Sequence, residues 1–186
     1  MRKILWSFFE IFETLLIAVV AVFLIRTFVA QPFLVSGSSM KQSFNDGDYL
    51  LVDELVYRFR EPERGEVVVF KNDASKGSYF IKRIVGMPGE HLTVDKGVVA
   101  VGLGDDLHAL NESYTINPRL IGNTDITLGD GEYFVMGDNR GFSLDSRSWG
   151  PLDEDDIVGL VRLRLWPFNK VMAIEAPVYW ELGIKN

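Results

Sequence analysis

The sequence predicts a mainly β domain that follows one N-terminal transmembrane helix. From Ile4 to Ile25 the chain reads ILWSFFEIFETLLIAVVAVFLI, which is apolar at most positions. After Pro32, short runs rich in Val, Ile, Phe and Tyr alternate with Gly, Asp and Pro, and long amphipathic helical periodicity is absent. We therefore expect a cytoplasmic tip and membrane anchor over residues 1–30 and a β domain over residues 31–186.

The length of the apolar segment favours a retained anchor. At 1.5 Å per residue its 22 residues span about 33 Å, close to the roughly 30 Å of a hydrocarbon core. A cleavable signal peptide is the main alternative, but it needs small residues one and three before the cut, and Phe28 precedes Ala30 at that spacing. Arg2 and Lys3 should keep the N-terminus cytoplasmic, which places the β domain outside.

Two carboxylates, Glu10 and Glu13, interrupt the apolar segment on one helical face. They can reach toward lipid headgroups at the end that carries the basic residues, or they can make a polar contact with a partner. We favour the first interpretation.

Beyond the anchor, the apolar runs are bounded by turn dipeptides such as Asp46-Gly47 and Pro88-Gly89. The segment from about Thr93 to Gly131 is richer in Gly, Asp and Asn, which indicates an insertion between two halves of the core. The expected strands are Phe33–Ser36, Tyr49–Asp53, Glu66–Lys71, Tyr79–Gly86, His91–Asp95, Gly97–Val101, Glu132–Met136 and Ile157–Trp166.

The composition excludes several kinds of site. The chain has no cysteine, so disulfides, thiolate zinc sites and cysteine nucleophiles are absent. The net charge of −7 disfavours binding to nucleic acid, and no basic patch offsets it. The acidic run Asp153–Asp156 is interpreted as a solvated turn, because nothing near it in the sequence completes a set of metal ligands.

The stretch VSGSSMKQSF, residues 35–44, is either a flexible linker or the site of a nucleophilic serine. A serine hydroxyl needs a neighbouring base to accept its proton. His91 and His108 lack the flanking residues that a Ser-His-Asp system would suggest, and we interpret both as incidental surface histidines.

Lysine can replace histidine where a dry pocket lowers its pKa toward neutrality. Lys82 lies in the apolar run SYFIKRIVGMPGE, and strand alternation puts Lys82 and Arg83 on opposite faces. One of the two must therefore face the apolar interior. The local sequence leaves open whether that residue is Lys82 or whether Lys82 is an exposed strand lysine.

A third polar stretch, MGDNRGFSLDSRSWG at residues 136–150, follows an expected strand. Asp145 and Arg147 are predicted to form a local ion pair that fixes the loop, and Ser143 could offer a hydroxyl that orients a lysine amine. Dense polar loops of this kind commonly position functional groups.

Together, the apolar segment and these stretches resemble the bacterial type I signal peptidases, the membrane-bound serine–lysine proteases of the S26 group. The resemblance covers nearly the whole chain and implies a β domain of antiparallel sheets with a small inserted subdomain, here at about residues 93–131. Its motifs occur in the expected order as SGSSM, DGDYLLVDEL, RGEVVVF, IKRIVGMPGE and GDNRGFSLDSRSWG.

The resemblance also implies roles for individual residues. Ser39, immediately before Met40, would be the nucleophile and Lys82 its general base. Ser143 would hydrogen-bond the lysine. The pair of Asp145 and Arg147 would brace the site, and the strand containing Val67, Val68, Val69 and Phe70 would pair with the substrate.

The chain departs from the family's pattern in the nucleophile loop. Gln42 and Ser43 stand where the family usually has Pro and Thr, and Gly37 stands where some members place an oxyanion-hole serine. The hole would then use the Ser39 backbone N–H and another main-chain donor. If Gln42 leaves the nucleophile loop less rigid, Gln42→Pro should preserve or raise activity.

The resemblance implies an enzyme that cuts signal peptides from exported preproteins at the outer face of the bacterial cytoplasmic membrane. Signal peptides and the lipid bilayer are the expected partners, the protein-export machinery is a further candidate, and no metal or organic cofactor is expected.

Two alternatives remain. A self-cleaving repressor should carry a DNA-binding helix pair where this chain has the apolar segment, and a membrane-tethered peptide-binding module of the same fold would have little or no activity. The endoplasmic-reticulum branch of the family has histidine in place of Lys82, which disfavours that branch.

Overall fold

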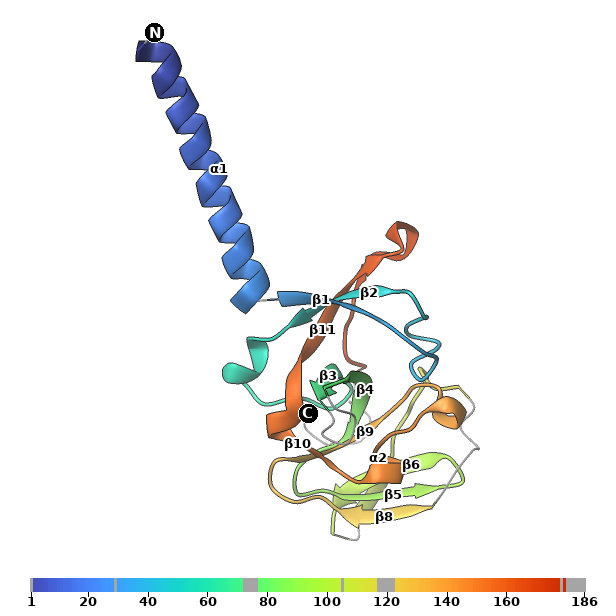
Figure 1. Cartoon of the computed structure of the whole chain (residues 1–186). Coiled ribbons are helices and arrows are strands. Elements are labelled where there is room, and N and C mark those ends of the chain that lie inside the picture. Colours follow the sequence, from blue (N-terminus) through green and yellow to red (C-terminus); the bar gives the residue numbers. More distant parts are fainter. Residues whose placement is uncertain are drawn as a thin grey trace.

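The computed structural model describes residues 2–28, 30–71, 77–104, 106–116, 123–177 and 179. A single long helix, α1 (Arg2–Phe28), projects away from a body made of two antiparallel sheets (Figure 1). The mainly β class and the antiparallel sheets predicted from the sequence are confirmed.

The side chains described in α1, Trp6 and residues 9–22, are exposed throughout, including Glu10 and Glu13. Among the residues that the structure describes, no helix is both long and apolar enough to cross a membrane. The transmembrane anchor predicted for residues 1–30 is therefore not confirmed.

The larger sheet contains eight strands, and sequence-distant strands lie side by side in it. In spatial order the strands are β1 (Ala30–Leu34), β2 (Tyr49–Asp53), β11 (Ile157–Trp166), β3 (Val67–Lys71), β4 (Tyr79–Gly86), β9 (Glu132–Met136) and β10 (Leu152–Asp153), with β12 (Met172–Ala173) paired to β11.

The smaller sheet is formed by chain segments that lie between β4 and β9 in the sequence. Its spatial order is β7 (Asp106–Ala109), β6 (Val98–Leu103), β5 (His91–Asp95) and β8 (Thr124–Thr127). The short strands β7 and β8 were not among those expected from the sequence, since polar residues interrupt their apolar pattern.

Apolar side chains pack on both faces of the central strand β3. Val67 and Val69 belong to one core cluster, whereas Val68 and Phe70 belong to another on the opposite face. None of the four is more than 3% exposed. A continuous apolar run is what a strand buried on both faces requires.

This position of β3 corrects the predicted role of Val67, Val68, Val69 and Phe70 in substrate pairing. β4 pairs with β3 along one side and β11 pairs along the other, so the strand has no free edge. An added strand needs unpaired backbone N–H and C=O groups. β3 therefore offers no edge to which an extended peptide could be added.

The remaining elements in the described part of the chain are short helices in the loops. They are η1 (Val56–Arg58), η3 (Arg140–Phe142), α2 (Ser146–Trp149), η4 (Glu154–Asp156) and η5 (Phe168–Lys170). Two of them, η3 and α2, follow β9 and form the polar loop next to β4.

Candidate active site

The loop between β1 and β2 carries Ser39 and is anchored by its own apolar side chains. Met40 and Phe44 are each 1% exposed and belong to the core cluster beneath the loop. At the base of the loop, the Val35 backbone N–H donates to the Asp48 carbonyl at 2.9 Å. Anchoring on both sides holds a half-buried Ser39 at a defined place instead of on a mobile linker.

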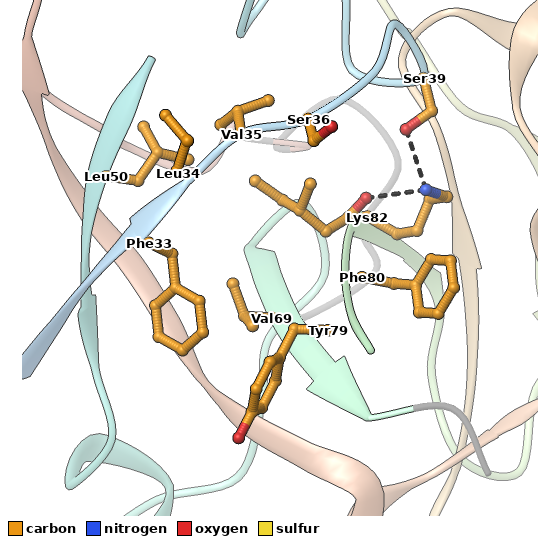
Figure 2. Close-up of a pocket in the computed structure, with 11 residues that line it drawn as sticks. Phe33, Leu34, Val35, Ser36, Ser39, Leu50, Val69, Tyr79, Phe80 and Lys82 are labelled. Carbon is orange, nitrogen blue, oxygen red and sulfur yellow. Dashed lines mark hydrogen bonds between the residues drawn. The ribbon is translucent and has the colours of Figure 1, made fainter. Parts of the chain in front are cut away.

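Lys82 reaches Ser39 from β4. Its Nζ lies 2.9 Å from Ser39 Oγ and 2.9 Å from the carbonyl oxygen of Ile81, as Figure 2 shows. Although 43 positions separate them in the sequence, the two side chains are in hydrogen-bond contact. The Lys82 residue is 3% exposed.

Burial makes this lysine unusually acidic. Removal from water lowers the pKa of Lys82 from 10.5 to about 8, although the charges of Asp145 and Asp138 oppose that shift. Desolvation penalises the charged form of an amine, which is why the pKa falls. At pH 7 about one such amine in ten is neutral, against fewer than one in a thousand for an exposed lysine.

Both Lys82 and Arg83 are buried, one on each face of β4. The sequence required only one of them to face the interior. Arg83 donates to both oxygens of Asp138, from Nε at 2.9 Å and from one terminal nitrogen at 2.8 Å. It also stacks over the Tyr114 ring, with 4.2 Å between the guanidinium carbon and the ring centroid. The charge of Arg83 is therefore paired, whereas Lys82 faces a hydroxyl and a carbonyl.

Asp145 and Arg147 form a two-pronged ion pair beside the lysine. The carboxylate accepts from Arg147 Nε and from a terminal nitrogen, both at 2.7 Å, and from the Gly137 backbone N–H at 3.0 Å. Burial alone would raise the pKa of Asp145, but these donors outweigh it and the pKa is lowered. The carboxylate stays ionised and fixed to its own partners.

Ser143 lies close to this carboxylate but makes no hydrogen bond to Lys82. Its buried Oγ has no hydrogen-bond partner among the described residues, although its proximity contributes to the lowered pKa of Asp145. The predicted hydrogen bond from Ser143 to the lysine is therefore not formed in this state.

Gly37 adopts φ +98°, and its backbone N–H donates to Asp46 Oδ1 at 2.8 Å. That N–H is committed to the loop and is not a second oxyanion donor. The Ser39 backbone N–H, in contrast, has no backbone acceptor among the described residues. It remains the best main-chain candidate for the oxyanion hole.

Asn139 is a positioning residue that the sequence reasoning did not single out. Its backbone N–H donates to the Ser39 carbonyl at 2.9 Å, and its side-chain amide donates to the Ser38 carbonyl at 3.0 Å. The polar loop after β9 therefore holds the nucleophile loop directly. Asn139 lies within the stretch GDNRG, and its place in that motif is the feature of the sequence that could have identified it.

An apolar pocket of about 170 Å³ leads away from Ser39 and Lys82 (Figure 2). Of the four β3 residues predicted to bind substrate, Val69 lines it. The other lining residues are Phe33, Leu34, Val35, Ser36, Leu50, Tyr79, Phe80 and Ile81.

The two strands that border this pocket have backbone available for pairing. β4 pairs with β9 from Arg83 onward, so within the described ranges Tyr79–Lys82 has no strand on that side. β1 is the terminal strand of the large sheet, and its outer side is likewise unpaired within those ranges. An extended peptide could therefore enter between β1 and β4.

The sequence of this chain is similar to a protein-family model and to several known proteins. Residues 8–166 match the family model described as "Signal peptidase, peptidase S26". The chain is 36% identical over 170 residues to "Probable signal peptidase I-2" of Synechocystis sp., covering 89% of this chain and 76% of that protein. It is 33% identical to "Signal peptidase I" of Bacillus licheniformis, covering 89% and 92%, and 34% identical to "Signal peptidase I T" of Bacillus subtilis, covering 89% of each.

The chain therefore belongs to peptidase family S26, the signal peptidases, and is a serine peptidase. Within that family its relatives identify it as a bacterial type I signal peptidase.

Gly137 permits the polar loop after β9 to approach the loop that carries Ser39 closely. The variant Gly137→Ala tests whether activity depends on this close approach. A Cβ atom there would lie 2.2 Å from Ser143 Oγ and 2.6 Å from the Ser39 carbonyl oxygen. The loops would have to separate, and we expect kcat/KM for peptide hydrolysis to fall roughly 100-fold while the fold is retained. Gly129→Ala is the matched control, since its Cβ would meet only the flexible Glu132 side chain at 3.2 Å. Equal activity of the two variants would contradict this account.

Gln42 adopts φ +108°, which corrects the expectation that Gln42→Pro would be tolerated. Proline fixes φ near −65°, so Gln42→Pro should lower the free energy of unfolding by about 1–3 kcal/mol. Gln42→Gly should raise it by about 1 kcal/mol, because glycine adopts positive φ without strain. Thermal unfolding measures both, with Lys41→Gly as a neighbouring control expected to destabilise. A stabilising Gln42→Pro would show that the loop follows a different path.

Proposed function

We propose that this protein removes signal peptides from exported preproteins, with Ser39 as the nucleophile and Lys82 as the general base. The observation that carries the proposal is the 2.9 Å contact between Lys82 Nζ and Ser39 Oγ, made by a lysine whose pKa is lowered to about 8. A neutral amine in hydrogen-bond contact with a hydroxyl is the minimum requirement for activating serine by lysine.

The proposed reaction has two halves. Neutral Lys82 accepts the Ser39 proton as Oγ attacks the scissile carbonyl, and the resulting ammonium returns that proton to the departing amine. A water molecule, deprotonated by the same amine, then hydrolyses the ester on Ser39. The oxyanion would accept a hydrogen bond from the Ser39 backbone N–H. These steps use no metal or organic cofactor.

Substrate binding is proposed to occur by strand addition between β1 and β4. The unpaired backbone of Tyr79–Lys82 can bond to any extended peptide, which gives affinity without selecting a sequence. Small side chains one and three residues before the cut would enter the apolar pocket over Val35 and Ile81. The limited volume of about 170 Å³ favours small side chains at these positions.

Attachment to a lipid bilayer is supported by two exposed apolar surfaces. The large apolar side chains described in α1 are each at least 46% exposed, which a helix in water would not favour. A second surface lies where β1 and β11 end and β2 begins. It contains Leu34, Tyr49, Trp166, Phe168, Val171 and Met172, all at least 45% exposed. Leu34 and Trp166 both pair with Tyr49, so this surface is continuous across the three strands.

In Figure 1, α1 and the end of β11 project from the same side of the body. One membrane could therefore contact both surfaces, with the pocket facing a signal peptide that is still embedded in that membrane. We propose that the N-terminus lies in the cytoplasm and that the β domain lies on the outer face of the bacterial cytoplasmic membrane. The export machinery would deliver the substrate there.

The proposed pair makes a prediction about activity and its pH dependence. Ser39→Ala, Lys82→Ala and Lys82→Arg should each abolish cleavage of a preprotein, because guanidinium cannot act as a base near neutral pH. In the wild type, kcat/KM should rise with pH through an apparent pKa of about 8, since the neutral amine of Lys82 is the active form.

Lys41→Arg, on the exposed side of the same loop, is the matched control and should keep full activity. A serine-reactive acylating probe should label Ser39 in the wild type and not in Ser39→Ala. Turnover by any of the three variants, or a profile that rises near pH 6.5 and depends on His91 or His108, would overturn the assignment.

A further inference from the structure

A tyrosine from the region of the small sheet contacts the strand that carries the lysine, on the face away from the substrate pocket. Tyr114 lies between β7 and β8, and its ring stacks over the guanidinium of Arg83. Arg83 and Lys82 point to opposite faces of β4. Tyr114 and Arg83 line a separate cavity of about 360 Å³, and neither is among the described residues that line the pocket beside Ser39. Tyr114 can therefore influence the reacting atoms only through other residues.

The ring of Tyr114 makes the first connection, which leads to the nucleophile loop. It confines the Arg83 guanidinium, with 4.2 Å between the guanidinium carbon and the ring centroid. Arg83 donates to both oxygens of Asp138, and the Ser43 hydroxyl donates to the same carboxylate. Ser43 lies in the loop that carries Ser39. A cation over an aromatic face is held more strongly when both are removed from water, as the buried Arg83 is here.

The hydroxyl of Tyr114 makes the second connection, which leads to the polar loop after β9. It donates to Glu112 Oε1 at 2.8 Å, and both terminal nitrogens of Arg140 donate to the same carboxylate. Arg140 Nε donates in turn to the Gly137 carbonyl at 3.1 Å. Gly137 is the point of close approach to the Ser39 carbonyl. One side chain is therefore connected to both loops of the site.

The C-terminal segment holds Tyr114 in place. Because the Tyr114 hydroxyl donates to Glu112, its oxygen accepts from the Tyr179 hydroxyl, and the two oxygens are 2.9 Å apart. Tyr179 is 5% exposed and belongs to the core cluster that contains Leu92 and Val101. It lies beyond residues 8–166, which are the part of the chain that matches the family model. This support is therefore a feature of the chain that the family match does not include.

We propose that Tyr114, held by Tyr179, is a positioning residue for the pair formed by Ser39 and Lys82. Its ring fixes the guanidinium on the opposite face of the lysine strand, and its hydroxyl fixes the polar loop. This rests on the proposed function and deepens it, because it names a residue outside the substrate pocket that supports the proposed base.

Asp138 links this geometry to the protonation of the lysine. The carboxylates that act on Lys82 are Asp138 and Asp145, and both raise its pKa. Each is held by a guanidinium, Asp138 by Arg83 and Asp145 by Arg147. If the ring over Arg83 is removed, the guanidinium is less confined and the charge of Asp138 is less well paired. The ammonium form of Lys82 is then favoured more strongly, so its pKa should rise.

The test uses the full chain in detergent micelles and an internally quenched signal-peptide substrate, with kcat and KM measured as a function of pH. In Tyr114→Leu, kcat should rise through an apparent pKa roughly half a unit or more above that of the wild type, which lowers kcat at pH 7 at least about threefold. KM should stay unchanged, because Tyr114 does not line the substrate pocket. Tyr114→Phe keeps the ring over Arg83 and should recover most of the wild-type pH profile.

The role of Tyr179 is tested by combining two substitutions. Tyr179→Phe alone should lower kcat about twofold, because Tyr114 loses the bond that holds it. In the Tyr114→Phe background, Tyr179→Phe should cause no further fall, since the acceptor of that bond is already absent.

Tyr57→Leu is the matched control, because Tyr57 makes the same kinds of contact elsewhere in the fold. Its hydroxyl donates to Glu66 at 3.0 Å, Arg60 binds the same carboxylate, and the Arg60 guanidinium lies 5.6 Å from the Tyr57 ring centroid. Tyr57→Leu should lower the thermal unfolding temperature as Tyr114→Leu does, but it should keep the wild-type kcat and pH profile. If Tyr114→Leu does not fold, Tyr114→Met replaces it, since the longer side chain fills more of the space of the ring.

A pH profile of Tyr114→Leu identical to that of the wild type would overturn the proposal. It would also be overturned by a change confined to KM, or by an equal shift in Tyr57→Leu, since either result would mean that the pH dependence does not depend on this contact. Failure of the wild type to cleave the peptide or a whole preprotein would instead contradict the proposed function itself, so the two failures can be told apart.

Discussion

The removal of one amine from water is the constraint on which the site depends. Lys82 is 3% exposed, and among the described residues its Nζ forms hydrogen bonds with two oxygen atoms that carry no formal charge, Ser39 Oγ and the Ile81 carbonyl. An exposed lysine in the same contact would remain an ammonium and could not accept the serine proton. Burial of β4 is therefore a requirement of the proposed chemistry as well as of the fold.

This burial has a cost in stability. Lowering the pKa of Lys82 from 10.5 to about 8 corresponds to roughly 3 kcal/mol against the folded state when the amine is charged. Between about pH 8 and 10.5 the unfolded chain binds more protons than the folded chain, so stability should rise with pH through that range. Below pH 8 the full penalty applies. The packing on both faces of β3 and β4 supports a site that is itself destabilising.

The charges around Lys82 are arranged so that they do not cancel the lowering of its pKa by burial. The negative charges of Asp138 and Asp145 both raise the pKa of Lys82 by favouring its ammonium form. Either carboxylate would favour the ammonium more strongly if it had no guanidinium partner of its own. Each is bound instead by a guanidinium, Asp138 by Arg83 and Asp145 by Arg147. The residues that brace the loops therefore also limit how far the carboxylates raise the lysine pKa. This dual role accounts for the ion pairs that lie beside the lysine, whose amine the proposed chemistry requires to be neutral.

Much of this could be predicted from the sequence, because the apolar runs and turn dipeptides determined the strands and the motif order indicated which polar stretches meet. Contacts between loops could not be predicted, since they depend on the path of each loop. The φ of Gln42, the hold of Asn139 on the nucleophile loop and the missing hydrogen bond of Ser143 are all of this kind. The role given to β3 failed for a related reason, because an apolar run does not reveal whether a strand lies at an edge or in the centre of a sheet.

The most direct test is the pKa of Lys82 itself. The protein labelled with ¹³C at the lysine ε-carbon would be titrated by NMR in detergent, and the Lys82 signal would be assigned by its loss in Lys82→Arg. The account predicts that this signal titrates near pH 8, well below the reference value of about 10.4 for a free lysine side chain. A Lys82 signal that titrates near that reference value would contradict it, since the amine would then be almost entirely charged at neutral pH.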